Sequence, residues 1–173
     1  MVILTKIWIF VDYSRCAGCR MCEVACSLEH EGVIWPEASR IRVFEFVPGV
    51  TIPTLCYQCP DYPCVKACPN DALEVDKETG AVKVRVSRCN MSGECIEACP
   101  AKIPRIPLGK NHVVICDLCG GNPKCVEACK QAGHNALKII EGAVQPIRKT
   151  FLEEAFSISE KLAKKMYDGL EGL

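Results

Sequence analysis

The cysteines of this chain fall into four groups with closely related spacing. The groups are Cys16-x2-Cys19-x2-Cys22-x3-Cys26, Cys56-x2-Cys59-x4-Cys64-x3-Cys68, Cys89-x5-Cys95-x3-Cys99 and Cys116-x2-Cys119-x5-Cys125-x3-Cys129. All four end in Cys-x3-Cys, so the chain contains an internal repeat. Thiolates are the usual ligands of iron–sulfur clusters, and these short spacings are typical of cluster-binding loops. The pattern therefore predicts one-electron redox chemistry on bound clusters.

Two other uses of cysteine fit less well. A secreted disulfide framework normally has an even cysteine count and a signal peptide. Here the count is 15, and the N-terminal MVILTKIWIF has no basic start and no small-residue cleavage site. Structural zinc usually takes two separated Cys-x2-Cys pairs, whereas residues 16–26 contain four cysteines. Iron–sulfur ligation is favoured over both.

The repeated spacing has a mechanical explanation. Three cysteines on a tight loop can bind one face of a cubane, while the fourth, one helical turn further on, points away and completes the cluster of another group. Pro69 and Pro100 directly follow the last cysteines of the second and third groups and are expected to end short helices there. Groups that exchange ligands must pair, so their clusters should lie close enough for electron tunnelling.

Short strands and helices are expected to position these groups. Strands are predicted over 7–12, 40–47 and 113–119, and a hairpin over 72–86 around a turn at 77–80. No linker divides this part of the chain. The predicted fold is α+β, with short hairpins and one-turn helices in a polyferredoxin-like domain over residues 1–145.

The C-terminal segment, 146–173, is predicted to be an amphipathic helix. Thr150 and Glu153 form a capping-box pattern. An apolar stripe recurs at three- and four-residue steps and comprises Phe151, Ala155, Ile158, Leu162 and Met166. We expect this stripe to pack on the protein's own cluster-binding core rather than on a partner.

These motifs resemble the four-cluster iron–sulfur subunits of molybdopterin and tungstopterin oxidoreductases, as well as related subunits of hydrogenase and carbon monoxide dehydrogenase systems. The resemblance lies in CAGCRMCEVACSLEH, CYQCPDYPCVKACPNDAL and CDLCGGNPKCVEAC and covers roughly residues 6–140. It implies two interleaved ferredoxin-like halves, in which the first group pairs with the fourth and the second with the third. Lys130 departs from the pattern, because proline is expected after Cys129; this affects the turn and not the ligation.

The resemblance implies four ligand sets. They are Cys16, Cys19 and Cys22 with Cys129; Cys116, Cys119 and Cys125 with Cys26; Cys56, Cys59 and Cys64 with Cys99; and Cys89 and Cys95 with Cys68. Ser92 stands where the last set should have another cysteine. Three [4Fe-4S] clusters are expected. The fourth is either [4Fe-4S] with a non-cysteine ligand, from Ser92 or water, or [3Fe-4S]; loss of the site is less consistent with its intact cysteines.

The expected function is electron relay between a larger catalytic oxidoreductase subunit and ferredoxin or another carrier. A tungsten aldehyde-oxidoreductase type of partner from anaerobic metabolism is favoured, with a hydrogenase, a carbon monoxide dehydrogenase or a free polyferredoxin role as alternatives. A cluster-based sensor would not need four clusters. Formal net charge is zero, so nucleic acid is not an expected partner. Without a membrane-spanning apolar run or a twin-arginine pair, a cytoplasmic location without membrane insertion is expected.

The remaining polar residues suggest no catalytic centre. His30, His112 and His134 are scattered, and a surface or hydrogen-bonding role is expected for each. His30 follows Cys26 closely enough to contact a cluster's surroundings. The pair Gly120 and Gly121 is interpreted as turn residues beside a cluster rather than as a phosphate loop.

Overall fold

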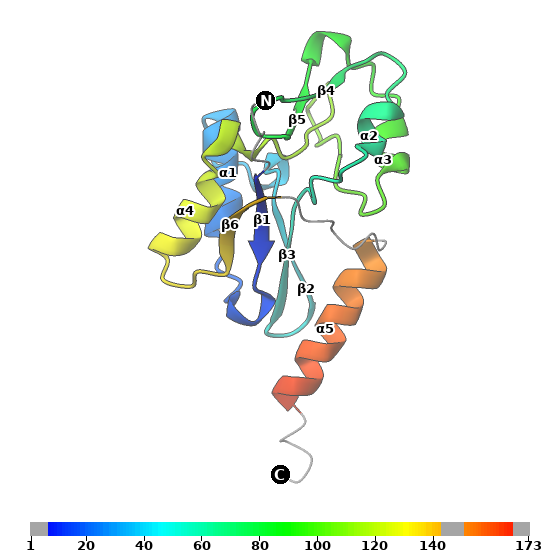
Figure 1. The fold of residues 1–173 in the computed structure, drawn as a ribbon. Helices are drawn as coiled ribbons and strands as arrows, with labels where there is room; N and C mark the ends of the chain where they lie inside the picture. The colour runs from blue at the N-terminus through cyan, green and yellow to red at the C-terminus, as the bar shows by residue number, and fades with distance from the viewer. Residues whose placement is uncertain (1–6, 143–150, 168–173) are drawn as a thin grey trace.

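The structure, a computed structural model, describes residues 7–142 and 151–167. Its strands are β1 (Ile7–Val11), β2 (Arg42–Val47), β3 (Val50–Thr54), β4 (Leu73–Val75), β5 (Val82–Val84) and β6 (Leu137–Glu141). Its α-helices are α1 (Met21–Glu31), α2 (Pro63–Lys66), α3 (Glu94–Ala98), α4 (Lys124–Gln131) and α5 (Phe151–Tyr167). The predicted α+β fold with short hairpins and a C-terminal helix is confirmed (Figure 1).

The strands form three separate antiparallel pairs, β1 with β6, β2 with β3, and β4 with β5. The pair β1–β6 joins opposite ends of the cysteine-containing region, with Ile7 opposite Glu141 and Val11 opposite Leu137. The predicted strands over 7–12 and 40–47 are present as β1 and β2. The hairpin predicted over 72–86 is present as β4 and β5, where Asp76 accepts N–H bonds from Glu78 and Thr79 in the turn.

The strand predicted over 113–119 is wrong. Val114 makes only an isolated bridge to Arg105. The chain then turns through Leu118 and Cys119, whose φ angles of 57° and 49° are left-handed and incompatible with a strand. The run VVI has the apolar character of a strand, but its residues are buried because they wrap a cysteine-lined core.

The expectation of one-turn helices holds for only two of the four groups. α2 and α3 are short and end just before Cys68-Pro69 and Cys99-Pro100. α1 and α4 run past their closing cysteines, because Ser27 and Lys130 stand where the other groups have proline. α1 ends at Glu31 and is capped by Gly32, whose left-handed φ of 71° lets its N–H bond to the Leu28 carbonyl.

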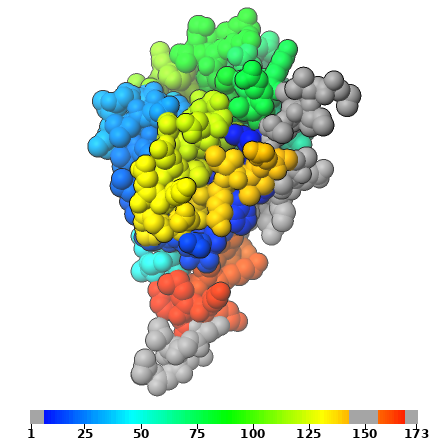
Figure 2. Space-filling view, turned by 60° about the vertical axis from the view of Figure 1, so that its left-hand side comes forward, coloured from blue at the N-terminus to red at the C-terminus, as the bar shows by residue number. Residues whose placement is uncertain are grey.

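The core has two main parts, and cysteines belong to both. In one part α1 packs against α4, beside β1 and β6 (Figures 1 and 2). The other part lies between α2, α3, β4 and β5. Cys56 packs against both parts, so the two parts of the core adjoin at this residue. This arrangement compensates for the shortage of large aromatic side chains.

Helix α5 lies along the β2–β3 hairpin, as Figure 1 shows. Ile158 and Leu162 pack on Val50 and Ile52, so the stripe covers the protein's own surface, as expected. The part of that expectation that placed the stripe on the cysteine-lined core is wrong, because Val50 and Ile52 belong to a separate small apolar cluster. Met166 does not follow that expectation, because it is 54 % exposed. The capping box of Thr150 with Glu153, and the side chains of Phe151 and Ala155, lie outside the described residues. The division into domains at residue 145 stays a prediction.

Among the helices in residues 7–142 and 151–167, none combines the length and the apolar composition needed to cross a bilayer.

Candidate iron–sulfur sites

The structure brings the predicted ligand sets together around cavities. One cavity is lined by the four cysteines of the Cys16 site: Cys16, Cys19, Cys22 and Cys129. A second cavity is lined by those of the Cys56 site: Cys56, Cys59, Cys64 and Cys99. A third cavity is lined by the Cys68 site: Cys68, Cys89 and Cys95 together with Ser92. Segments far apart in sequence thus meet as the implied pairing of groups requires.

The remaining four cysteines form the Cys26 site, which consists of Cys26, Cys116, Cys119 and Cys125. Three of them, Cys26, Cys116 and Cys125, are buried in one core with Leu118. Burial above all, and then the neighbouring thiols including Cys26, raise the pKa of Cys125 well above its ordinary value. These four thiols are therefore close enough to influence one another.

Each closing cysteine accepts a backbone N–H on its sulfur. The donor–acceptor pairs are Arg40 N to Cys26 Sγ (3.1 Å), Ala72 N to Cys68 Sγ (3.2 Å), Ile103 N to Cys99 Sγ (3.5 Å) and Ala136 N to Cys129 Sγ (3.2 Å). In the second and third groups the donor is four residues beyond the cysteine, since the chain turns back where the short helix ends. Such donors stabilise negative charge on a ligating sulfur and tune a cluster's potential.

The four sites form a row. In each of three cases burial is the largest cause of a raised cysteine pKa, and a thiol of the neighbouring site adds to it. Cys22 acts in this way on Cys125, Cys116 on Cys56, and Cys95 on Cys64. The order is therefore Cys16 site, Cys26 site, Cys56 site, Cys68 site. Cys19 at one end and Ser92 at the other are exposed, whereas the cysteines of the two middle sites are buried or half-buried.

The donor chemistry of the sites fits iron–sulfur clusters. All fifteen cysteines lie in the described part of the chain, and none forms a disulfide. Burial raises the pKa of Cys22 and of Cys64 to about 12, helped by the Glu23 carboxylate and neighbouring thiols at Cys22 and by neighbouring thiols at Cys64. Grouped buried thiolates are costly without positive charge nearby, and iron ions would supply that charge. The assignment of each cysteine as a ligand stays a prediction.

Cys26 differs from the other cysteines with shifted pKa values. Burial raises its pKa, but hydrogen bonds from His30 and from the backbone N–H of Arg40 outweigh burial, so the pKa is lowered. His30 Nδ1 lies 2.8 Å from the Cys26 carbonyl oxygen and 3.8 Å from Cys26 Sγ. The contact follows from sequence, because residues four apart on a helix share a face.

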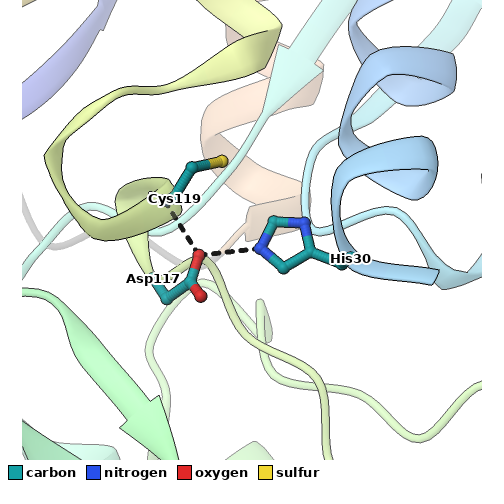
Figure 3. Close-up of side chains that lie close together, drawn as sticks. All are labelled: His30, Asp117 and Cys119. Carbon is teal, nitrogen blue, oxygen red and sulfur yellow. Dashed lines mark hydrogen bonds and ion pairs between the residues drawn. The ribbon is translucent and has the colours of Figure 1, made fainter. Parts of the chain in front are cut away.

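His30 is held from its other side by Asp117, as Figure 3 shows. The distance from His30 Nε2 to Asp117 Oδ1 is 2.9 Å, and the same oxygen accepts the Cys119 N–H at 2.9 Å. Burial lowers the pKa of His30, but hydrogen bonds to Asp117 and Cys26 outweigh it and raise the pKa to about 10. Sequence reasoning missed Asp117, although its place directly after Cys116 could have drawn attention to it.

Potential ligand atoms of His30, Asp117 and Cys119 lie within 4.8 Å of one another, a spacing compatible with a single metal ion. The Cys119 thiol, however, is part of the Cys26 site. We therefore assign His30 and Asp117 to the surroundings of that site.

Ser92 lies on an exposed loop at the edge of the Cys68 site. Its N–H bonds to Asn90 Oδ1 at 3.2 Å, and the adjacent Met91 and Gly93 have left-handed φ angles of 58° and 80°. Ser92 lines the same cavity as Cys68, Cys89 and Cys95. The serine therefore lies together with the three cysteines of this site.

Four cysteine-lined sites in an α+β scaffold of short hairpins and helices define a ferredoxin-like iron–sulfur protein. The family of 4Fe-4S dicluster domains matches residues 47–139, and the chain belongs to this family. An aliphatic sulfonate oxidoreductase, polyferredoxin-like subunit, of Pyrococcus furiosus is 60% identical over 162 residues, covering 94% of each chain.

More distant relatives are also similar over most of the chain. The electron transport protein HydN of Escherichia coli is 35% identical, covering 70% of this chain and 82% of the relative. A component of the anaerobic dimethyl sulfoxide reductase of Shigella flexneri is 33% identical, covering 72% of this chain and 70% of the relative.

Proposed function

We propose that this chain is the electron-transfer subunit of an oxidoreductase and relays single electrons along four iron–sulfur clusters. The observation that carries the proposal is the row of four cysteine sites, with mutually interacting thiols between neighbours and exposure at both ends. A row whose ends are exposed and whose middle is buried or half-buried suits entry of an electron at one end and exit at the other.

The clusters, when bound, would supply the one-electron redox chemistry. The cysteines hold the clusters, and backbone N–H groups such as Arg40 N and Ala136 N stabilise negative charge on the sulfurs. The Cys16, Cys26 and Cys56 sites offer four thiols each and are assigned [4Fe-4S] clusters. For the Cys68 site we propose a [4Fe-4S] cluster with an oxygen ligand, from Ser92 or water, and [3Fe-4S] is the rival.

The partner we propose is a larger catalytic subunit with a tungsten- or molybdenum-bound pterin. Two relatives support a partner subunit, since they are named as a subunit of a sulfonate oxidoreductase and as one component of a dimethyl sulfoxide reductase. Ferredoxin or another redox subunit would exchange electrons at the other end of the row. The cytoplasm is the proposed compartment, because reducing conditions there keep thiols available for cluster assembly.

One purification tests the proposal. The native protein, mildly tagged and isolated without oxygen, is assayed for iron, tungsten, molybdenum and nickel. We expect about 16 iron atoms per chain, by the four-cluster assignment, and tungsten or molybdenum in a larger co-eluting protein. Nickel in that protein would replace the pterin partner with a hydrogenase or carbon monoxide dehydrogenase.

A lone iron-loaded chain would contradict the subunit role and favour a free polyferredoxin. That alternative has some support, because the HydN relative is named as an electron transport protein rather than as a subunit. Absence of iron from the anaerobically isolated chain would refute electron relay altogether.

A further inference from the structure

We propose that His30, positioned by Asp117, raises the reduction potential of the Cys26 site selectively, so that this site is the first of the four to accept an electron. The inference rests on the proposed electron-transfer function and deepens it. It follows from how the first cysteine group differs in structure from the other three.

The difference begins with the length of α1. In the second and third groups the helix stops at the closing cysteine, and the residue four positions on, Ala72 or Ile103, uses its backbone N–H to bond the sulfur. In the first group α1 continues to Glu31, so the residue four positions after Cys26 remains on the helix. That residue is His30, and its side chain reaches back to Cys26.

The ring of His30 is oriented by acceptors on both sides. Nδ1 faces the Cys26 carbonyl oxygen and sulfur, and Nε2 faces the Asp117 carboxylate. The Cys26 carbonyl oxygen and the Asp117 carboxylate can only accept hydrogen bonds, so both ring nitrogens of His30 serve as donors. The Asp117 carboxylate also accepts the Cys119 N–H, which fixes its position beside the same site. The imidazole therefore presents an N–H toward Cys26 in one orientation.

The Cys26 sulfur accepts the Arg40 N–H at 3.1 Å, and His30 Nδ1 lies 3.8 Å from the same sulfur while it also contacts the Cys26 carbonyl oxygen at 2.8 Å. Cys26 therefore has a side-chain N–H near its sulfur in addition to a backbone donor. For Cys68, Cys99 and Cys129 the sulfur contacts found among the described residues are backbone N–H groups. A donor toward a ligating sulfur stabilises the more negative, reduced state and raises the potential. The half-buried guanidinium of Arg105 interacts electrostatically with Cys26 and adds positive charge near it.

The Asp117 carboxylate partly offsets this effect, since it adds negative charge near Cys119. His30 limits this offset: without the imidazole, the Asp117 carboxylate would face the site with one hydrogen-bond donor fewer. Removal of His30 therefore lowers the potential through two effects of the same sign, the lost donor and the exposed carboxylate.

The test compares His30→Leu, His30→Gln and His112→Leu in the iron-loaded protein. His112 is the matched control, because its ring nitrogen contacts Asn111 and not a cysteine sulfur. Midpoint potentials of the individual clusters are measured by EPR-monitored redox titration, and iron content is measured on the same samples.

For His30→Leu we expect the first cluster to be reduced to shift downward, with at least a tenfold lower reduced-to-oxidised ratio at fixed ambient potential, about 59 mV for one electron. The other three potentials should stay unchanged. The glutamine amide can still donate, so His30→Gln should shift less, and His112→Leu should not shift.

Unchanged potentials in His30→Leu with full iron content would overturn the inference and leave the proposed function intact. Equal shifts in all four clusters would also overturn it, since they would indicate a general structural effect. If His30→Leu loses iron, the His30→Gln potential decides: an unshifted first cluster would refute tuning. Failure of the wild-type protein to hold clusters would refute the proposed function instead.

Discussion

Gly18 lies between Cys16 and Cys19, and replacing it with alanine should disturb the Cys16 site in a way that a second substitution repairs. Its φ of +68° is left-handed, and a Cβ at this position would lie 2.7 Å from the Cγ2 methyl of Thr51. The next nearest Thr51 atoms, Cβ and Oγ1, would be 3.6 Å away, which is ordinary contact. The clash is thus with one methyl group.

The size of the effect has two parts. Alanine in the left-handed region costs about 1–2 kcal/mol, and forcing a methyl into a packed site costs about 1–3 kcal/mol more. Gly32→Ala is the matched control, because Gly32 has a similar φ of +71° and nothing within 4 Å of the added Cβ. Gly32→Ala should therefore lose only the about 1–2 kcal/mol that comes from the left-handed backbone.

Thr51→Ser removes the clashing methyl but keeps the hydroxyl that donates to the Cys16 carbonyl at 3.1 Å. In Gly18→Ala/Thr51→Ser we expect the second part of the cost to disappear, a coupling of about 1–3 kcal/mol. Urea denaturation of the iron-loaded proteins, followed by cluster absorbance and by circular dichroism, gives the midpoints. Gly18→Ala should have the lowest midpoint, with the double variant close to Gly32→Ala.

The reasoning would be refuted if Thr51→Ser changed the urea midpoint by the same amount in the Gly18→Ala protein as in the wild-type protein. It would be refuted equally if Gly18→Ala and Gly32→Ala had the same midpoint. Iron content, measured on every sample, separates loss of a cluster from loss of stability alone.

Three further predictions follow from the sites and from α5. Ser92→Cys should leave the iron content unchanged and alter the spectrum of one cluster; a gain of one iron atom per chain would instead show that the native Cys68 site holds [3Fe-4S]. Leu162→Ala should weaken the contact of α5 with the β2–β3 hairpin by about 1–2 kcal/mol, which would be seen as faster amide hydrogen exchange in α5. Met166→Ala should not speed this exchange, because the Met166 side chain is exposed. Equal exchange rates in the two variants would contradict the packing. Removal of iron under anaerobic conditions should reduce the helical circular dichroism signal, because buried cysteines of α1 and α4 form much of one core. Reconstitution with iron and sulfide should restore the signal. An unchanged spectrum after iron removal would show that the core is stable without clusters.

Much of the architecture could be predicted from spacing and alternation. The Cys-x3-Cys repeats placed the short helices, and alternating apolar residues placed β1, β2 and the β4–β5 hairpin. Cys-Pro marked where α2 and α3 end. These features are local, so a single segment of sequence contains the necessary information.

The errors arose where the environment overrides the local pattern. Residues 113–115 look like the start of a strand, but they are apolar because they line the core before the left-handed turn at Leu118 and Cys119. Met166 fits the helical stripe, yet it lies beyond the surface that Val50 and Ile52 provide. The His30 contact with Asp117 joins residues 87 positions apart, and no local pattern specifies such a pair.

The pairing of β1 with β6 has a consequence for how the protein is made. The core formed around Cys64, Leu73, Val82, Cys95 and Ile115 uses a continuous middle part of the chain. Strand β1, by contrast, cannot pair until residues 137–141 have been synthesised, and these residues leave the ribosome last among the paired strands. Contacts between distant segments form slowly, because a long loop must close first. We therefore expect the middle half to fold during synthesis and the outer half to close around it afterwards. Until that closure, the thiols of the first cysteine group would remain accessible to the machinery that delivers iron and sulfide.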